Sequence, residues 1–460
     1  MTALAINHQY RYHRSSELAA EADGSHLRLA TCGGIDEAPQ FFRGKLLHPR
    51  RTADLLRGLV AIVQSRFYVP PAMLARILAL ADPVVTSSES VLRFEAFSAC
   101  CSTYARVDLL EPSFDGERLG RGTTNVDFNA PLRAALARIR DADSVAFAVG
   151  VDAFELSRGC ESVVERKVRL PVRWLKEFVE VQAYQARTSR RWEISGLEAQ
   201  RLLRSLPRST GTVAGWVVPA GRGLRLSQTA GKDGLRLDGV QRLRVLEPLA
   251  RHAKTLRVYQ DQSTDASAWE LVLGEARFHL VLSPQVSRGF SGEGQVLAEL
   301  AASQWQDILP RVRASLQWEN TIDSERLAAK FALPRESVAA ALSVLGSRGL
   351  VGYDLAEGRY FHRELPFDLS LIDALQPRLR EAREIVAEGG VRIERQESDS
   401  VEAYVRGTGV EHRVRLSAEQ ARCSCPWYAK HQGERGPCKH VLAAQIFLEA
   451  GGDREPESSS

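Results

Sequence analysis

Residues 423–440 read CSCPWYAKHQGERGPCKH, and this stretch decides the fold of the C-terminal part of the chain. It places Cys423, Cys425, Cys438 and His440 in the pattern C-x-C-x12-C-x-H. Three thiolates and one imidazole suit tetrahedral Zn²⁺, with bonds of about 2.3 Å to sulfur and about 2.0 Å to nitrogen. Because four protein ligands leave no place for an activated water, the pattern predicts one structural Zn²⁺ ion that stabilises a segment too small to fold unaided.

The segments on either side of the cysteines have strand and helix patterns. Residues 391–397 (VRIERQE), 401–407 (VEAYVRG) and 412–417 (HRVRLS) alternate in polarity, as antiparallel strands do. Residues 440–450 (HVLAAQIFLEA) have the apolar spacing of a helix that begins at the second ligand pair. His431 is an alternative ligand, but the tight C-x-H spacing favours His440. The sequence therefore predicts a β-hairpin before the first ligand pair and a helix after the second.

Basic and aromatic residues surround the predicted metal site. Lys430, Arg435 and Lys439 lie between or beside the ligand pairs, next to Trp427 and Tyr428. Such a surface is suited to contact with nucleic acid or with a protein partner.

A second recognition module is predicted immediately upstream. Residues 321–363 contain a first helix capped by Ser324, a turn at Leu333–Pro334, a second helix ended by Gly349, and a two-stranded hairpin. This order is typical of a winged helix-turn-helix. If the module binds DNA, the candidate contacts are the basic residues of the second helix and the hairpin, Arg335, Arg348, Arg359 and Arg363. Protein docking or a purely structural role is an equally good interpretation.

The charge of the chain is unevenly distributed. The formal net charge is only +4, yet residues 165–257 hold 20 basic and 8 acidic residues, so this stretch carries +12 and the rest of the chain −8. Arginine alternates with leucine in segments such as Leu224-Arg225-Leu226. Alternation of this kind on strands predicts either a basic sheet face that follows phosphates or a solvated outer face. Which of the two applies depends on whether the arginines gather in space.

The N-terminal part mixes helical and strand patterns. Residues 53–67 and 70–81 have helical spacing, while residues 91–99 and 144–154 alternate as strands do. Residues 122–129 (GTTNVDFN) form either a ligand loop or, as we favour, a turn followed by a helix cap. Since no nucleophile–base pair or open metal site can be identified, an enzyme is not expected. The chain has no apolar run of about 18 residues and no signal peptide, so a cytoplasmic protein without a membrane partner is expected.

The C-x-C-x12-C-x-H pattern between a β-hairpin and a helix resembles the SWIM-type zinc finger, a ββα module, with all four ligand positions matched. Further segments resemble bacterial SWIM zinc-finger proteins, among them RFEAFSACCSTYARVDLL, GTTNVDFNAPLRAAL, RGFSGEGQVL, GYDLAEGRYFHRELPFD and CPWYAKHQGERGPCKHVLAA. The resemblance implies a family of largely uncharacterised function, often encoded near MoxR-type AAA+ ATPases and von Willebrand A-domain proteins. It supplies no catalytic residues.

These observations predict an α+β multidomain protein. We expect a mixed α/β domain over 1–155, a basic β-rich domain over 156–290, a winged-helix-like domain over 291–375, a ββα SWIM zinc-finger module over 376–450 and a disordered tail over 451–460. The function expected is a non-enzymatic zinc-binding adaptor or regulator. It would bind DNA, RNA or protein partners through the finger and the winged helix, in association with an AAA+ ATPase or a von Willebrand A-domain protein. The alternative is a pure protein-interaction subunit of an AAA+ complex without nucleic-acid binding.

Overall fold

The structure is a computed structural model that describes most of the chain. The described residues are 17–21, 24–28, 40–66, 83–126, 128–151, 153–158, 161–166, 172–208, 213–261, 263–290, 294, 297–301, 305, 307–365, 376–397, 400–417 and 420–450. The predicted helix over 70–81 and the predicted tail over 451–460 lie outside them. Among the described helices, none combines the length and the apolar character that crossing a bilayer requires.

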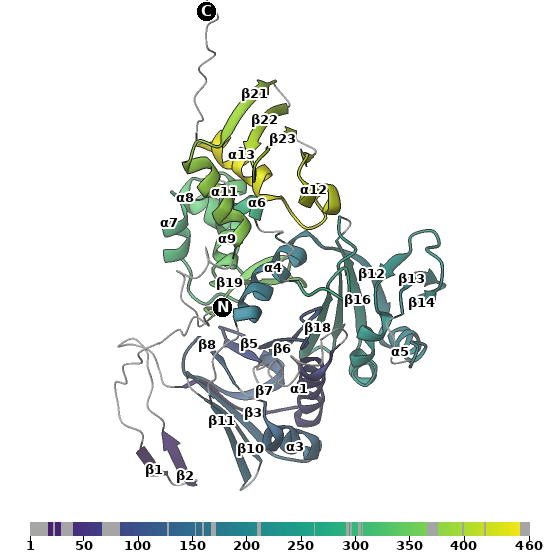
Figure 1. The fold of residues 1–460 in the computed structure, drawn as a ribbon. Helices are drawn as coiled ribbons and strands as arrows, with labels where there is room; N and C mark the ends of the chain where they lie inside the picture. The colour runs from purple at the N-terminus through teal and green to yellow at the C-terminus, as the bar shows by residue number, and fades with distance from the viewer. Residues whose placement is uncertain are drawn as a thin grey trace, which may run out of the picture.

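An eight-stranded antiparallel sheet forms the centre of the molecule (Figure 1). Its strands, in spatial order, are β12 (Ser189–Ser195), β16 (Thr255–Gln260), β17 (Ser267–Val272), β18 (Ala276–Leu282), β6 (Thr103–Leu110), β5 (Val91–Phe97), β4 (Val84–Ser87) and β8 (Gly122–Asn125). The register between β18 and β6 places Phe278 opposite Val107. The predicted boundary between residues 155 and 156 therefore does not divide two sheets, because strands from both sides of it share one hydrogen-bonded ladder and one core.

A second, five-stranded antiparallel sheet packs against the central sheet. Its order is β11 (Glu161–Arg166), β10 (Ala153–Arg158), β9 (Val145–Gly150), β3 (Gln40–Leu46) and β7 (Phe114–Arg118). Phe94 of β5 contacts Phe147 of β9 and Phe154 of β10, with ring centroids 6.5 and 5.9 Å apart. These rings join the two sheets into one apolar core.

Helices and short strands cover this core. α1 (Pro49–Gln64) lies on β5 and β6 and contacts α3 (Ala130–Arg138). Asn129 caps α3 by accepting a hydrogen bond from the Leu132 N–H at 3.2 Å, so the helix cap predicted for residues 122–129 is confirmed. Gly122–Asn125 form the edge strand β8 and not the predicted turn. The remaining elements of this half are β1 (Glu17–Glu21), β2 (Gly24–Arg28), η2 (Glu111–Ser113), α5 (Gly196–Arg204), β13 (Gly215–Ala220), β14 (Gly223–Ser227), β15 (Leu235–Leu237), η3 (Val240–Leu246) and η4 (Ala250–His252).

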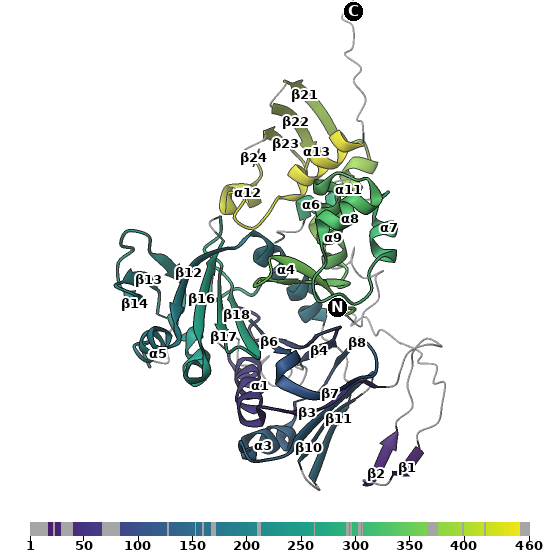
Figure 2. The same cartoon turned by 180° about the vertical axis from the view of Figure 1, so that it is seen from behind.

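The C-terminal half has a core of its own (Figure 2). Its elements are α6 (Leu297–Ala301), α7 (Leu309–Ala314), α8 (Ser324–Phe331), α9 (Arg335–Ser347), β19 (Val351–Asp354), β20 (Arg359–His362), α11 (Pro377–Ala387), β21 (Val391–Gln396), β22 (Ser400–Arg406), β23 (Glu411–Ser417), β24 (Ala421–Cys423), α12 (Pro426–His431) and α13 (Lys439–Glu449). α4 (Val172–Arg187) joins the two halves, because Phe178 and Tyr184 belong to the first core while Val179 and Ala183 belong to the second. The predicted order of helix, turn, helix and hairpin is present as α8, α9, β19 and β20.

The N-cap of α8 is Asp323 rather than the predicted Ser324. The backbone of Asp323 is extended, and one carboxylate oxygen accepts hydrogen bonds from the N–H groups of Glu325 and Arg326, both at 3.0 Å. Ser324 is the first helical residue and cannot act as the cap. Both residues are good capping types, so the sequence alone did not separate them.

Candidate metal centre

The four predicted ligands come from three adjoining elements at the C-terminal end of the chain. β24 ends at Cys423, Cys425 is the N-cap of α12, and Cys438 is the N-cap of α13. His440 lies in the first turn of α13. Their ligand atoms all lie within 4.8 Å of one another, and all four side chains are buried. The structure thus brings together every residue of the predicted metal site.

Backbone N–H groups point at the sulfur atoms. Cys423 Sγ accepts from the Cys425 N–H at 3.4 Å, Cys425 Sγ from the Tyr428 N–H at 3.3 Å, and Cys438 Sγ from the Val441 N–H at 3.5 Å. Such donors stabilise thiolates, the form in which cysteine binds a metal. The Cys423 thiol, together with His440 and the Val441 N–H, lowers the pKa of Cys438 to about 4 against the effect of burial.

The cluster fits a zinc ion. In a tetrahedron with bonds of about 2.3 Å, two ligands are separated by about 3.8 Å. Cys423 Sγ lies 3.9 Å from His440 Nδ1, which agrees with that geometry. His431 is not part of the cluster: its ring packs against Trp427 at a centroid distance of 4.8 Å. The ring of His412 lies 4.4 Å from the ring of His440 and helps to bury it.

A closed site with three cysteines and one histidine, placed between a hairpin and a helix, defines a structural zinc finger. Residues 412–446 match the family model of the SWIM zinc finger, so the zinc-finger prediction is confirmed.

No curated protein matches the chain. Among solved structures, the proliferating cellular nuclear antigen of Entamoeba histolytica aligns with 54% of this chain and 99% of its own, at 9% identity and a TM-score of 0.36. A chain of the PCNA2–PCNA3 complex of Sulfolobus tokodaii aligns with 53% of this chain and 99% of its own, at 8% identity and a TM-score of 0.38.

The second helix of the helix-turn-helix segment is mostly buried. Only Arg335, Glu336 and Ala339 of α9 are exposed. Arg335 forms an ion pair with Glu325 at 2.9 Å, and the guanidinium of Arg348 lies over the ring of Trp305 at 5.5 Å. α9 therefore offers one exposed turn, rather than a full face, to any ligand.

The hairpin is also partly buried, and the prediction that Arg363 contacts a partner is wrong. Arg363 is 1% exposed, forms a short ion pair with Glu95 of β5, and lies over Phe178 at 4.5 Å. Its partner is 268 residues away in the sequence, so no local pattern reveals the pairing. Arg359 remains exposed and lies 3.7 Å from Asp323.

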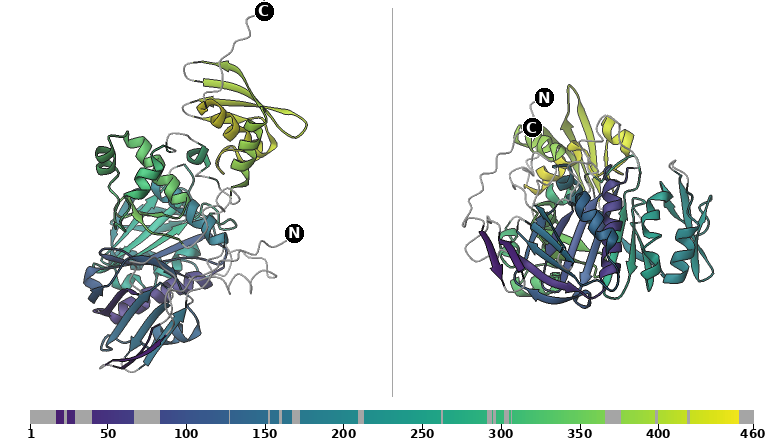
Figure 3. Two further views of the ribbon diagram at one scale, coloured as in Figure 1. Left: turned by 90° about the vertical axis from the view of Figure 1, so that its left-hand side faces the viewer. Right: turned by 90° about the horizontal axis from the view of Figure 1, so that it is seen from below.

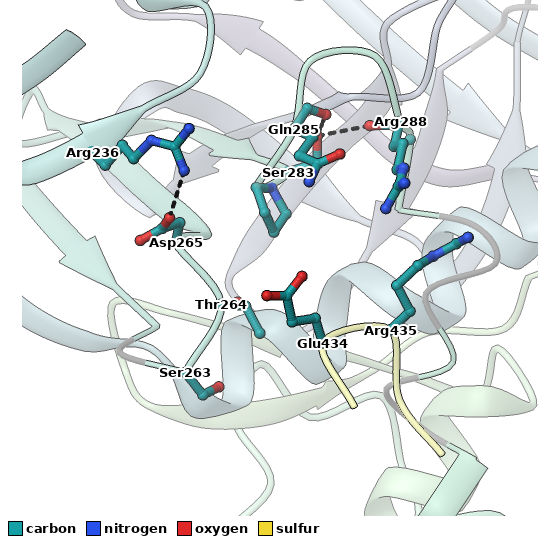
Figure 4. A pocket seen from close by; sticks show the side chains of 11 residues that line it. Arg236, Ser263, Thr264, Asp265, Ser283, Gln285, Arg288, Glu434 and Arg435 are labelled. Carbon is teal, nitrogen blue, oxygen red and sulfur yellow. Dashed lines mark hydrogen bonds and ion pairs between the residues drawn. The ribbon is translucent and has the colours of Figure 1, made fainter. Parts of the chain in front are cut away.

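The three basic residues predicted around the finger have different surroundings. Lys430 is exposed, whereas Lys439 forms an ion pair with Glu381 of α11 at 2.8 Å. Arg435 lines a cavity of about 290 Å³ between the finger loop and the central part of the molecule, together with Glu434, Arg288 and Arg236 (Figure 4). In this cavity Arg236 is held by Asp265 at 3.4 Å.

The structure shows a further basic surface, which contains none of the predicted contact residues. β21–β24 form one antiparallel sheet, and α13 packs against one side of it (Figure 3). The charged and aromatic residues of the opposite side, called here the outer sheet face, are Arg392, Arg395, Glu402, Tyr404, Arg406, Glu411, Arg413, Arg415 and Arg422. The alternation in residues 412–417 was the available signal, since it places Arg413 and Arg415 on the side opposite the buried Val414.

Proposed function

We propose that the chain is a non-enzymatic, zinc-stabilised binding protein whose outer sheet face contacts the phosphate backbone of nucleic acid. Six arginines and two glutamates are the charged residues that the register places on this face. Tyr404 stands among them, with the guanidinium of Arg392 over its ring at 4.9 Å. Arginine and a partly exposed aromatic ring are residue types that bind backbone phosphates and bases.

The observation that carries this proposal is the pair Arg415 and Arg422. The register places them directly opposite each other on β23 and β24. Like charges in this position destabilise a sheet, because their Cβ atoms lie about 5 Å apart. Among the described residues, Arg422 donates to the amide oxygen of Gln420 at 2.9 Å, and neither arginine forms an ion pair within 4 Å, although Glu402 lies opposite Arg415 on β22. An anionic ligand would remove the repulsion.

The helix-turn-helix segment has a smaller part in this proposal. We propose that α8, α9, β19 and β20 form a winged helix that serves mainly as a structural connection between the central sheet and the finger. The burial of α9 and of Arg363 supports this assignment. The exposed residues Arg335 and Arg359 would make at most peripheral contacts.

Fluorescence anisotropy with labelled single-stranded and duplex DNA over a salt series tests the nucleic-acid proposal. The logarithm of the affinity should fall with the logarithm of the salt concentration, by about 0.9 per phosphate contact on duplex DNA and about 0.7 on a single strand. The variant R415E/R422E should reduce this slope by roughly two contacts.

The matched control is R222E/R225E, which makes the same change in net charge on exposed residues at β14. It should bind as the unaltered protein does. Equal losses in the two variants would assign the effect to total charge, and salt-independent or absent binding in the unaltered protein would rule out the proposal.

A second candidate function is a protein-interaction subunit of an AAA+ complex. Several arginines of the outer sheet face already pair with carboxylates, among them Arg413 with Glu402, Arg392 with Glu394, and Arg395 with Glu397. A face of mixed charge is compatible with an acidic protein partner. Co-purification from the native host separates the two candidates. If an ATPase or a von Willebrand A-domain protein still co-purifies after nuclease treatment, this candidate is favoured. If nuclease treatment abolishes the co-purification, the first candidate is favoured.

A further inference from the structure

A large groove lies between α1 and the segment that contains η3 and η4. Its volume is about 1030 Å³, and its described lining residues include seven arginines and a single carboxylate, that of Asp54. The arginines are Arg50, Arg57, Arg66, Arg208, Arg242, Arg244 and Arg251. Four of them belong to the basic stretch 165–257 and three to α1 and the residues after it, so arginines from distant parts of the sequence gather in space.

Close packing of α1 builds the groove. A Cβ atom on Gly58 would lie 2.9 Å from Leu249 Cδ1, so the helix can approach η3 and η4 closely only with glycine at this position. Ile62, Val245 and Leu249 supply apolar lining around the arginines. The groove therefore has a rigid wall on α1 and on the 3₁₀ segments.

Asp54 is shared by several cations. Its carboxylate lies 3.4 Å from Arg50, 3.4 Å from Arg57, 2.5 Å from Arg251 and 3.2 Å from His252. Burial tends to raise the pKa of Asp54, but the hydrogen bonds from Arg251 and His252 and the nearby arginines hold it below its ordinary value. One negative charge thus faces three guanidinium groups.

Among the other arginines, Arg208 lies 3.9 Å from Glu247, which is outside the groove lining, and the rest face no carboxylate of the described lining. Arg66 and Arg244 form no ion pair with any described residue. Arg242 is 1% exposed and donates to the carbonyl oxygens of Ser102 at 2.8 Å and Ser283 at 3.0 Å. The Nε atoms of Arg242 and Arg244 are buried, without a hydrogen-bond partner in the described part of the chain. The groove accordingly has an excess of positive charge.

We propose that this groove binds a linear, phosphate-bearing polyanion, namely the sugar-phosphate backbone of a nucleic-acid strand. Arg50, Arg57 and Arg251 all reach Asp54, so their guanidinium groups form one cationic cluster, and Arg66 and Arg244 add further positive charge to the lining. The volume lies at the upper limit for small-molecule sites. None of the described lining residues is aromatic, so these residues would recognise a strand through its backbone.

The ligand class follows from the proposed function, but the groove is a separate site that does not require the finger. A nucleic-acid strand held in the groove and at the outer sheet face would contact the protein at two basic surfaces. Two such contacts on one strand raise the overall affinity through effective concentration.

The test compares three variants that change net charge equally. R57E/R66E alters two exposed arginines of the groove, R415E/R422E alters the outer sheet face, and R222E/R225E is the control. Anisotropy is measured with a labelled single-stranded oligonucleotide over a salt series, and thermal melting checks that each variant is folded. R57E/R66E should weaken binding about tenfold relative to the control and lower the salt slope by about 1.4. Arg244→Gln, which keeps the size of the side chain, should weaken binding in the same direction.

The outcomes for the two sites are distinguishable. If R57E/R66E binds like R222E/R225E while R415E/R422E is weakened, the groove inference fails and the proposed function stands. If R57E/R66E alone is weakened, the groove inference stands and the outer sheet face is not the nucleic-acid site. Inorganic tripolyphosphate is the second probe. If R57E/R66E loses binding of tripolyphosphate but keeps binding of the oligonucleotide, the groove binds a free polyphosphate. That result would overturn the nucleic-acid inference.

Discussion

Arg363 shows how burial changes the role of a single residue. Its guanidinium pairs with Glu95, which also accepts a hydrogen bond from the Tyr104 hydroxyl at 2.7 Å. Removing one member of a buried ion pair leaves the other charge unpaired, at a cost of about 3–5 kcal/mol. Arg363→Ala should therefore lower the free energy of unfolding by about that amount, measured by urea denaturation. Arg359→Ala, at an exposed position, should change it by less than about 0.5 kcal/mol. Equal effects in the two variants would contradict the burial argument.

At the zinc ligands, one substitution should remove the metal. Cys438 both contributes a sulfur ligand and caps α13, so Cys438→Ser should release zinc and unfold β21–α13, since structural zinc binding supplies folding free energy. Metal analysis should find about one zinc in the unaltered protein and much less in the variant. Cys100→Ser, at a buried cysteine outside the cluster, is the control and should keep the metal. Retention of a full equivalent by Cys438→Ser would contradict the assignment of the ligands.

At the scale of elements, sequence-based prediction succeeded where an element is fixed by contacts between residues close in the sequence, and failed where the contacts are distant in the sequence. Cys423 and His440 lie 17 residues apart, and the strands around them show clear alternation, so the ligands and the finger elements could be predicted. The boundary at residue 155 could not, because β6 pairs with β18 across about 170 positions. The groove arginines also come from distant segments. Composition revealed the excess of charge, but only the fold shows where that charge gathers.

The cap of α8 provides a prediction at the same scale. Asp323→Ala should lower stability by about 1 kcal/mol, since a side-chain acceptor for two backbone N–H groups is lost. The backbone hydrogen bond from Arg326 lowers the pKa of Asp323, so its contribution is present at neutral pH and is lost as the pH falls through the lowered pKa. Urea denaturation should show this difference at pH 7, and Ser324→Ala should have little effect. If Ser324→Ala lowered the free energy of unfolding more than Asp323→Ala does, Ser324 and not Asp323 would be the N-cap.

At the scale of the molecule, a buried charge network holds the hairpin on the central sheet. Asp354 of β19 lies 2.9 Å from Arg93 of β5 and 3.0 Å from Arg106 of β6. Asp108 lies 2.9 Å from Arg106 and 3.3 Å from His279, and the guanidinium of Arg93 lies 4.0 Å from the centre of the Phe361 ring. Although three of these groups could hold a metal, the two arginines already neutralise both carboxylates. The network therefore makes the helix-hairpin segment part of the central body.

This arrangement predicts that, as the pH falls, the zinc finger unfolds before the rest of the molecule. Burial tends to raise the pKa values of Asp108 and Asp354, but Arg106 and Arg93 lower them below the ordinary value of aspartate. Both carboxylates therefore stay ionised, and they continue to stabilise the fold at pH values below the ordinary pKa of aspartate. Zinc binding, in contrast, requires deprotonated ligands and weakens as the pH falls. On acidification from pH 7 to about 4, zinc should be released first, because the ligands protonate while the carboxylates do not. Hydrogen exchange should then show loss of protection in β23 and α13 while β5, β6 and β18 stay protected. Simultaneous loss in both regions would mean that the finger and the body unfold as one unit.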